Sequence, residues 1–339
     1  MSDTLPGGTP AAPAPVPAAV VAPPAVQPKY PIYIVSKGRA EKSLRPTTTY
    51  LERMGVQYNI VVEEPEADAY RAGVRGRVLV LDPEYQRKYD PCMELAPGQS
   101  VGSGAARNFA WDHALKEGHA RYWCVDDNIA GFYRFHENRK VLALTGAFFR
   151  PMEDFVDRYT NVAMAGPHYE HFVLRCSEHP PFIANSRIYS CNLIQTDLPF
   201  RWRARYNEDT ILSLDLLKAG YCTVLFIAYL QNKIATQRTA GGNMLELYKG
   251  GTLEKSKQLV RLHPDVARLV WKWNRWHHHV DYRPFAGNKM IRRPDVVIPA
   301  TPQDYGMKLV TVGKKAPSPG TAQTAKPAGK LAPKKGKPR

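Results

Sequence analysis

Short apolar runs, rich in β-branched or aromatic side chains, recur along the first third of the chain. Their length and composition predict buried strands. Segments with apolar positions three and four apart lie between them and predict helices, each ended by a glycine. The expected strands are 31–35, 58–62, 77–81 and 121–125, and the expected helices are 46–54 and 103–117. Elements that alternate at this spacing are typical of an α/β fold with a mostly parallel sheet flanked by helices.

The second half of the chain continues the pattern with two helices and a strand. A helix is expected over 209–219, and it is followed by a strand over 221–229. Another helix is expected over 264–278, because apolar side chains recur there at helical spacing. These side chains are Val266, Leu269, Val270, Trp273 and Trp276. The last two tryptophans are therefore expected to pack in the core.

Both ends differ in composition from the middle. Residues 1–29 are dominated by proline and alanine, and residues 301–339 are of low complexity and rich in lysine. Such segments bury too little apolar surface to offset the entropy lost on ordering, so both are expected to be disordered tails. Residues 30–300 are expected to form one domain.

Composition and charge narrow the class of protein. The longest apolar run, 221–230, is far shorter than the roughly 20 residues of a membrane-spanning helix. Five cysteines without a C-x-x-C pair exclude a disulfide scaffold and favour a reducing, cytoplasmic setting. The formal charge of +16 divides into +8 for residues 313–339 and +8 for residues 30–312. A basic body suits a polyanionic partner such as nucleic acid, and it equally suits a protein kept soluble by its charge.

Two adjacent carboxylates, Asp126 and Asp127, directly follow the strand expected at 121–125. In open α/β sheets, ligand sites form outside the carboxyl ends of the strands. Neighbouring carboxylates repel each other unless a cation lies between them, and hard oxygen ligands suit Mg²⁺ or Mn²⁺ beside phosphates. The pair is therefore a candidate metal site. The alternative is a surface turn, for which Asp-Asp-Asn is also suitable.

A glycine-rich turn at 102–104 opens the helix expected over 103–117. Glycines let a ligand approach the backbone, the helix start presents N–H groups to an anion, and Arg107 adds a charge for phosphate. The segment is not a dinucleotide fingerprint, since Arg107 replaces the third glycine of that motif. The alternative is that the glycines simply form a loop.

Two further polar segments lie at the ends of expected elements. Glu208 and Asp209 stand at the start of the helix expected over 209–219, where a carboxylate either acts as a general base or stabilises the helix dipole. The loop 36–39 follows the first expected strand and contains two cations and a glycine. A loop of this composition at the end of a strand suits the binding of a nucleotide base or a diphosphate.

These four segments, in this order, resemble the nucleotide-diphospho-sugar glycosyltransferases of the GT-A fold. They look most like the phage glycosyltransferases associated with TET/JBP dioxygenases, over roughly residues 30–250. The resembling segments are PIYIVSKGRA (31–40), VVEEPEADAY (61–70), ARNFAWDHA (106–114), WCVDDNI (123–129), YNEDTILSL (206–214) and TAGGN (239–243). One departure is Asn128, which makes the acidic motif D-D-N instead of D-x-D.

The resemblance implies a GT-A-like (Rossmann-like) fold and a transfer reaction. A sugar would move from a nucleotide-diphosphate donor, expected to be a UDP-sugar, to the hydroxymethyl group of 5-hydroxymethylcytosine or a related pyrimidine in phage DNA. The expected setting is the cytoplasm of an infected bacterium. The implied donor contacts are Ser36, Lys37, Gly38, Arg39, Arg107 and Asn108, the implied ligands of Mg²⁺ or Mn²⁺ are Asp126 and Asp127, and the implied base of an inverting enzyme is Asp209 or Glu208. A retaining enzyme would need no such base.

A double-stranded DNA acceptor would need a surface that binds phosphates. Arg201, Arg203 and Arg205 are expected to contact the backbone, and the basic, aromatic run 271–279 offers a second candidate surface. Two other functions stay open: a GT-A transferase with a protein or glycan acceptor, and an inactive nucleic-acid-binding protein that kept the fold.

Overall fold

The computed structural model describes residues 26–175, 179–234 and 252–298. The tails expected at 1–29 and 301–339 lie outside these ranges except for residues 26–29, so the expected domain boundaries stay a prediction. At Lys29 the chain is already held in place, because the backbone N–H donates to Glu153 over 2.8 Å and the ammonium pairs with Asp157 at 2.6 Å. None of the described helices is both long and apolar enough to cross a membrane.

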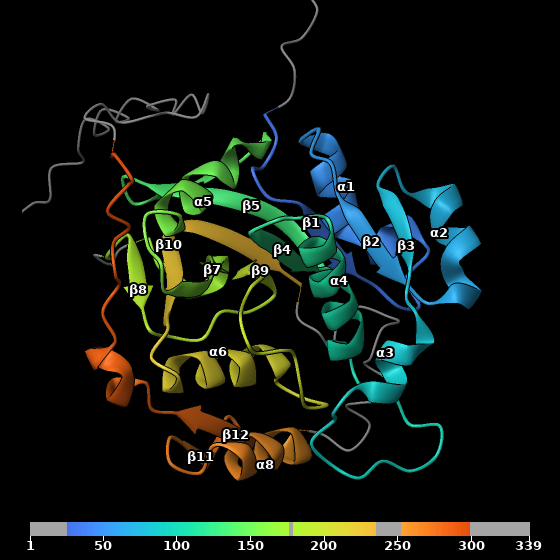
Figure 1. The fold of residues 1–339 in the computed structure, drawn as a ribbon. Helices are drawn as coiled ribbons and strands as arrows, with labels where there is room; N and C mark the ends of the chain where they lie inside the picture. Colours follow the sequence, from blue (N-terminus) through green and yellow to red (C-terminus); the bar gives the residue numbers. More distant parts are fainter. Residues whose placement is uncertain (1–25, 176–178, 235–251, 299–339) are drawn as a thin grey trace, which may run out of the picture. The chain divides into compact units, whose positions relative to one another are not determined.

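Four parallel strands from the first part of the chain form one side of the central sheet (Figure 1). Ile34 of the central strand lies beside Ile60 on one side and Val125 on the other. All three side chains are fully buried, which explains why these strands read as continuous apolar runs. In spatial order the strands are β3 (Arg77–Val80), β2 (Asn59–Val62), β1 (Ile32–Val35) and β4 (Arg121–Asp126).

The sheet continues past β4 with strands from the second part of the chain. The next strand is antiparallel to β4, and the pair β7–β10 is again parallel. In spatial order these strands are β9 (Cys191–Gln195), β7 (Val162–Tyr169), β10 (Cys222–Lys233), β5 (Ile129–His136) and β6 (Arg139–Leu142), and β8 (Phe182–Ala184) also pairs with β10. The strand expected at 221–229 therefore runs further, to Lys233.

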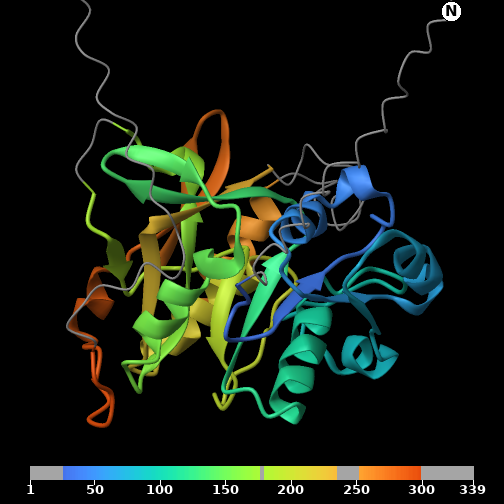
Figure 2. The ribbon, with the colours of Figure 1, turned by 90° about the horizontal axis from the view of Figure 1, so that it is seen from above.

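Helices cover both faces of the sheet, which confirms the expected α/β fold. Leu51 of α1 and Met152 of α5 pack in one core cluster, and Trp111 of α4 and Leu216 of α6 pack in the other. Figure 2 shows α1 and α4 on opposite sides of β1. The helices are α1 (Pro46–Arg53), α2 (Ala67–Gly73), α3 (Pro83–Lys88), α4 (Gly104–Lys116), α5 (Arg150–Val156), α6 (Glu208–Lys218) and α8 (Leu253–Leu262). Short 3-10 turns lie at 42–44, 64–66, 146–148, 170–172 and 283–287.

The prediction of a helix over 264–278 is wrong, because this segment is a β-hairpin. Its strands β11 (Ala267–Lys272) and β12 (Arg275–Val280) pair antiparallel as a separate two-stranded sheet. Trp273 and Asn274 form the two-residue turn with φ of 50° and 57°. Two successive left-handed residues are the geometry of a tight hairpin turn, and they cannot occur inside an α-helix. The expected core positions of the tryptophans are also wrong, since Trp273 is 81% and Trp276 is 40% exposed.

Candidate active site

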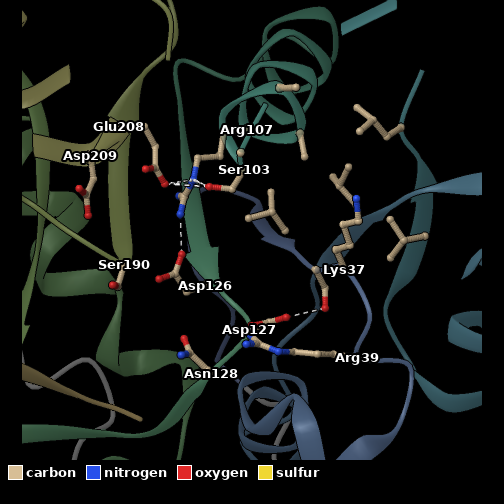
Figure 3. A pocket seen from close by; sticks show the side chains of 18 of the residues that line it. Lys37, Arg39, Ser103, Arg107, Asp126, Asp127, Asn128, Ser190, Glu208 and Asp209 are labelled. Carbon is tan, nitrogen blue, oxygen red and sulfur yellow. Dashed lines mark hydrogen bonds and ion pairs between the residues drawn. The ribbon is translucent and has the colours of Figure 1, made fainter. Parts of the chain in front are cut away.

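A cavity of about 250 Å³ opens at the carboxyl ends of β1 and β4. Its walls come from the loop after β1, the end of β4, the first turns of α4 and α6, the last residue of β10 and the first turn of α8 (Figure 3). The structure therefore brings together most of the candidate site residues. Those that line the cavity are Ser36, Lys37, Arg39, Arg107, Asp126, Asp127, Arg205, Glu208 and Asp209.

Asp126 lies between two cations at the centre of the cavity. One carboxylate oxygen accepts from the Arg107 guanidinium at 2.5 Å, and the other is paired with the Lys233 ammonium. Lys233 also donates to the Ser190 hydroxyl at 2.7 Å. Burial disfavours the charged carboxylate, but Lys233 and Arg107 outweigh burial and hold the pKa of Asp126 well below its usual range. Asp126 is therefore ionised at neutral pH.

Asp127 points to the other side, toward β1 (Figure 3). Its carboxylate accepts from the Ser36 hydroxyl at 2.6 Å and forms a buried ion pair with Arg39. Burial raises the pKa of Asp127, although Arg39 and Ser36 act in the opposite direction. These bonds fasten the loop after β1 to the end of β4. The neighbouring Asn128 is used inside the fold, because its amide donates to the backbone oxygen of Ile234 at 3.0 Å.

In the observed arrangement, Asp126 and Asp127 have no unengaged carboxylate oxygen with which to bind a divalent ion. All four carboxylate oxygens of Asp126 and Asp127 are engaged by Arg107, Lys233, Arg39 or Ser36. Within the described ranges, there is also no group of three or more His, Cys, Asp or Glu side chains placed to hold a metal. The positive charge beside the acids is supplied by protein side chains. The predicted Mg²⁺ or Mn²⁺ would have to displace at least one of them.

Arg107 links the first turn of α4 to that of α6. Its buried guanidinium stacks 4.9 Å from the Trp202 ring and lies 3.4 Å from Glu208, whose carboxylate also accepts from the Ser103 hydroxyl at 2.8 Å. The glycine at 104 is required here, because a Cβ would lie 1.9 Å from the Tyr89 hydroxyl. The close packing around the helix start thus fixes Arg107 at the wall of the cavity.

Asp209 follows Glu208 but has a different environment. Its carboxylate accepts from the Thr210 backbone N–H at 2.7 Å, and none of the described basic side chains forms an ion pair with it. Burial raises the pKa of Asp209, and the neighbouring Glu208 raises it further. Of the two predicted bases, Glu208 is occupied by Arg107 and Ser103. Asp209 is left as the carboxylate with a raised pKa, which suits a general base near neutral pH.

The loop after β1 lies across the cavity from Asp209 (Figure 3). Lys37 pairs with Glu63 at 3.0 Å and remains partly exposed. Beside it, the side chains of Val35, Val61 and Leu81 form an apolar wall. Gly38 takes a left-handed conformation with φ of 65°, and its N–H donates to Glu66 at 2.7 Å. The cavity thus has an apolar side near Lys37 and an acidic side near Asp209.

Asn108 is not brought into the cavity. Both groups of its side-chain amide are used by the Trp202 backbone, because Nδ2 donates to the Trp202 oxygen at 2.9 Å and Oδ1 accepts from its N–H at 2.9 Å. In the structure Asn108 therefore holds the segment before α6 against α4.

The three arginines at 201, 203 and 205 point in different directions. Arg201 pairs with Asp112 at 3.1 Å and stacks 4.9 Å from the Trp111 ring, and Arg203 makes two bonds of 2.9 and 2.8 Å to Asp215. Arg205 is buried in the cavity wall, where its Nε has no hydrogen-bond partner among the described atoms. Their binding of DNA phosphates stays a prediction.

Among the residues that line the cavity, sequence reasoning missed Lys233, Ser190 and Lys255. Lys233 lies 107 residues from Asp126 along the chain, and Ser190 stands just before a strand that the sequence analysis did not identify. The only local signal for Lys233 is a lysine at the end of the long apolar run that forms β10.

A comparison with family models places this geometry in context. The model described as TET-Associated Glycosyltransferase matches residues 30–242, more than half of the chain. The search of curated proteins found no match to the chain. The match agrees with the resemblance carried by the sequence motifs. The last of those motifs, TAGGN at 239–243, lies outside the described residues.

Proposed function

Because the chain belongs to the TET-associated glycosyltransferase family, we propose that it transfers a sugar to 5-hydroxymethylcytosine, or a related modified pyrimidine, in DNA. The donor in this proposal is a nucleotide-diphosphate sugar, with a UDP-sugar as the first choice. The observation that carries the proposal is the cavity, in which the cations Arg107 and Lys233 lie between an apolar wall and a carboxylate with a raised pKa. The setting, a phage-infected bacterium, stays a prediction.

We place the donor with its base against Val35, Val61 and Leu81 and its diphosphate toward Arg107 and Lys233. An apolar slot suits the face of a nucleotide base, and fixed cations suit a diphosphate whose negative charge grows as the sugar leaves. Both cations are already held by Asp126, so they need no reorganisation when the leaving group forms.

Asp209 completes the reaction on the acceptor side. The hydroxymethyl oxygen attacks the anomeric carbon of the sugar while the bond from that carbon to the diphosphate breaks. The proton of the hydroxyl passes to the Asp209 carboxylate, and the nucleoside diphosphate leaves with the bonding electron pair. A direct displacement of this kind inverts the anomeric centre. The raised pKa of the Asp209 carboxylate therefore favours the inverting form of the reaction.

A divalent ion at Asp126 and Asp127 stays a prediction, and no step above depends on it. In this proposal, Lys233 and Arg107 bind the diphosphate without a metal.

Mass spectrometry of nucleosides tests the proposal directly. Duplex DNA that contains 5-hydroxymethylcytosine is incubated with the full-length protein and a mixture of sugar nucleotides, and unmodified cytosine is the internal control. A gain of one sugar on the modified base supports the proposed reaction. Hydrolysis of a donor without this gain would move the acceptor to a protein or a glycan. No donor consumption at all would favour an inactive nucleic-acid-binding protein.

A further inference from the structure

The hairpin β11–β12 packs on the protein with one face at its base, whereas its tip is exposed, with Trp271 57% and Trp276 40% exposed. Opposed residues of an antiparallel pair share a face, so the pairs Ala267–Val280 and Leu269–His278 lie on one side. Ala267 and Val280 pack in the same apolar cluster as Leu259 of α8, which shows that this side faces the protein. The opposite side carries the pairs Arg268–His279, Val270–His277 and Lys272–Arg275.

The outer face of the hairpin is basic and aromatic. Arg268, Lys272 and Arg275 are exposed, and none of them forms an ion pair with a described residue. At the turn, the Trp273 ring packs edge-on against His277 with centroids 5.3 Å apart, so it lies over the same face. No acidic residue occurs between 267 and 280. An exposed tryptophan among cations without ion-pair partners fits a polyanion with stacking bases.

The hairpin is attached at the rim of the candidate active site. The Thr252 hydroxyl, just before α8, donates to the Trp276 backbone oxygen at 2.7 Å. Lys255, three residues further on, lines the cavity, and its backbone oxygen accepts from Asn207, the residue before Glu208. Lys255 is also close enough to His278 of the hairpin to help lower the pKa of that imidazole. Figure 1 shows β11, β12 and α8 packed below α6.

We propose that the hairpin β11–β12 binds double-stranded DNA in the major groove and holds the target base, flipped out of the duplex, at the cavity, with Trp273 stacking on a base that the flip leaves unstacked and Lys272 and Arg275 contacting phosphates. This inference rests on the proposed function, because it names the surface that presents the DNA acceptor. The 5-substituent of a pyrimidine lies in the major groove, and that groove is about 12 Å wide and admits a two-stranded β-ribbon. The hairpin is such a ribbon.

The test compares duplex binding and sugar transfer for Trp273→Ala and for the double variant Lys272→Ala, Arg275→Ala. Both sites are exposed at the tip, so the fold is expected to persist. The matched controls are Leu144→Ala, an exposed apolar side chain, and Arg71→Ala, an exposed cation on α2. The probe is a fluorescent duplex with one 5-hydroxymethylcytosine, titrated at several salt concentrations.

We expect Trp273→Ala to weaken duplex binding by at least about fivefold, since stacking on one base contributes this much or more. The double variant is expected to flatten the slope of log K against log salt by about 1.8, the contribution of two phosphate contacts. Both variants should hydrolyse the donor in the absence of DNA at the wild-type rate, and the controls should bind as the wild type does.

Other results would overturn the inference in distinguishable ways. Wild-type transfer to DNA with unchanged binding by both variants would refute the role of the hairpin and leave the proposed function intact. A second result would be that the variants bind the duplex as the wild type does but lose sugar transfer to a protein or glycan acceptor. This result would assign the hairpin to that other partner and also refute the DNA acceptor.

Discussion

Asp209→Asn separates the chemical step from donor binding. The asparagine has nearly the same shape, and its oxygen can still accept from the Thr210 N–H. The variant therefore keeps the first turn of α6 but loses the proposed general base. Because burial and Glu208 already disfavour the charged aspartate, the neutral side chain should not lower the thermal midpoint of unfolding.

The expected loss is large and confined to turnover. A positioned general base contributes roughly 10²–10⁴ in rate, or about 3–5.5 kcal/mol of activation free energy. Donor affinity should stay at the wild-type level, because Asp209 lies across the cavity from Lys37 and the apolar wall. Single-turnover transfer to a 5-hydroxymethylcytosine duplex measures the rate, and calorimetry with the donor measures the affinity.

The pH profile gives a second readout of the same group. A protonated Asp209 cannot accept the proton, so wild-type transfer should fall as the pH drops through the raised pKa of Asp209. That decline should lie above the ordinary aspartate range near 3.9. As a control, Asp112→Asn removes a carboxylate outside the cavity and should change the rate by no more than about twofold. Transfer by Asp209→Asn at nearly the wild-type rate would refute the base and point to a retaining reaction.

Four further predictions concern other parts of the molecule. Lys233→Met should raise the donor dissociation constant at least about 10-fold by calorimetry, since a charge-assisted hydrogen bond contributes roughly 1.5–3 kcal/mol. Donor binding by the wild type should persist in excess EDTA; loss that Mg²⁺ or Mn²⁺ restores would make Asp126 and Asp127 metal ligands. Deleting residues 313–339, which carry eight basic residues and no acid, should weaken duplex binding and flatten its salt dependence, and an unchanged slope would contradict this role. Glu153→Ala should lower the free energy of unfolding by about 3 kcal/mol in urea titrations, because the buried Trp123 N–H and two backbone N–H groups lose their acceptor.

The sequence was most informative where structure is decided locally. Strand β4 and helix α4 lie within one residue of their predicted bounds, because apolar periodicity and a glycine cap define them. The placement of Asp126 and Asp127 at the mouth of the sheet followed from the same pattern. The cationic partners of these acids could not be predicted from that pattern, since Lys233 reaches Asp126 only through the pairing of strands that are distant in sequence.

The hairpin at 267–280 shows where periodicity alone is ambiguous. Apolar side chains at Val266, Leu269, Val270, Trp273 and Trp276 satisfy a helical spacing, yet the segment is rich in β-branched and aromatic residues that favour strands. The deciding residue is Asn274, which tolerates the left-handed conformation of the turn and ends any helix there. Nothing in the sequence indicates that Trp273 also takes the left-handed conformation.

The ion pair between Asp126 and Lys233 sets an order for synthesis of the protein. A ribosome makes Arg107 before Asp126, but it adds Lys233 more than 100 residues later, after β7 and β9. Until β10 has formed, the carboxylate at the centre of the domain has only one of its two cations. The cavity is thus completed among the last parts of the domain. A chain that stops short of β10 keeps the parallel strands β3, β2, β1 and β4, but it lacks Lys233 and the strand with which β5, β7 and β8 pair.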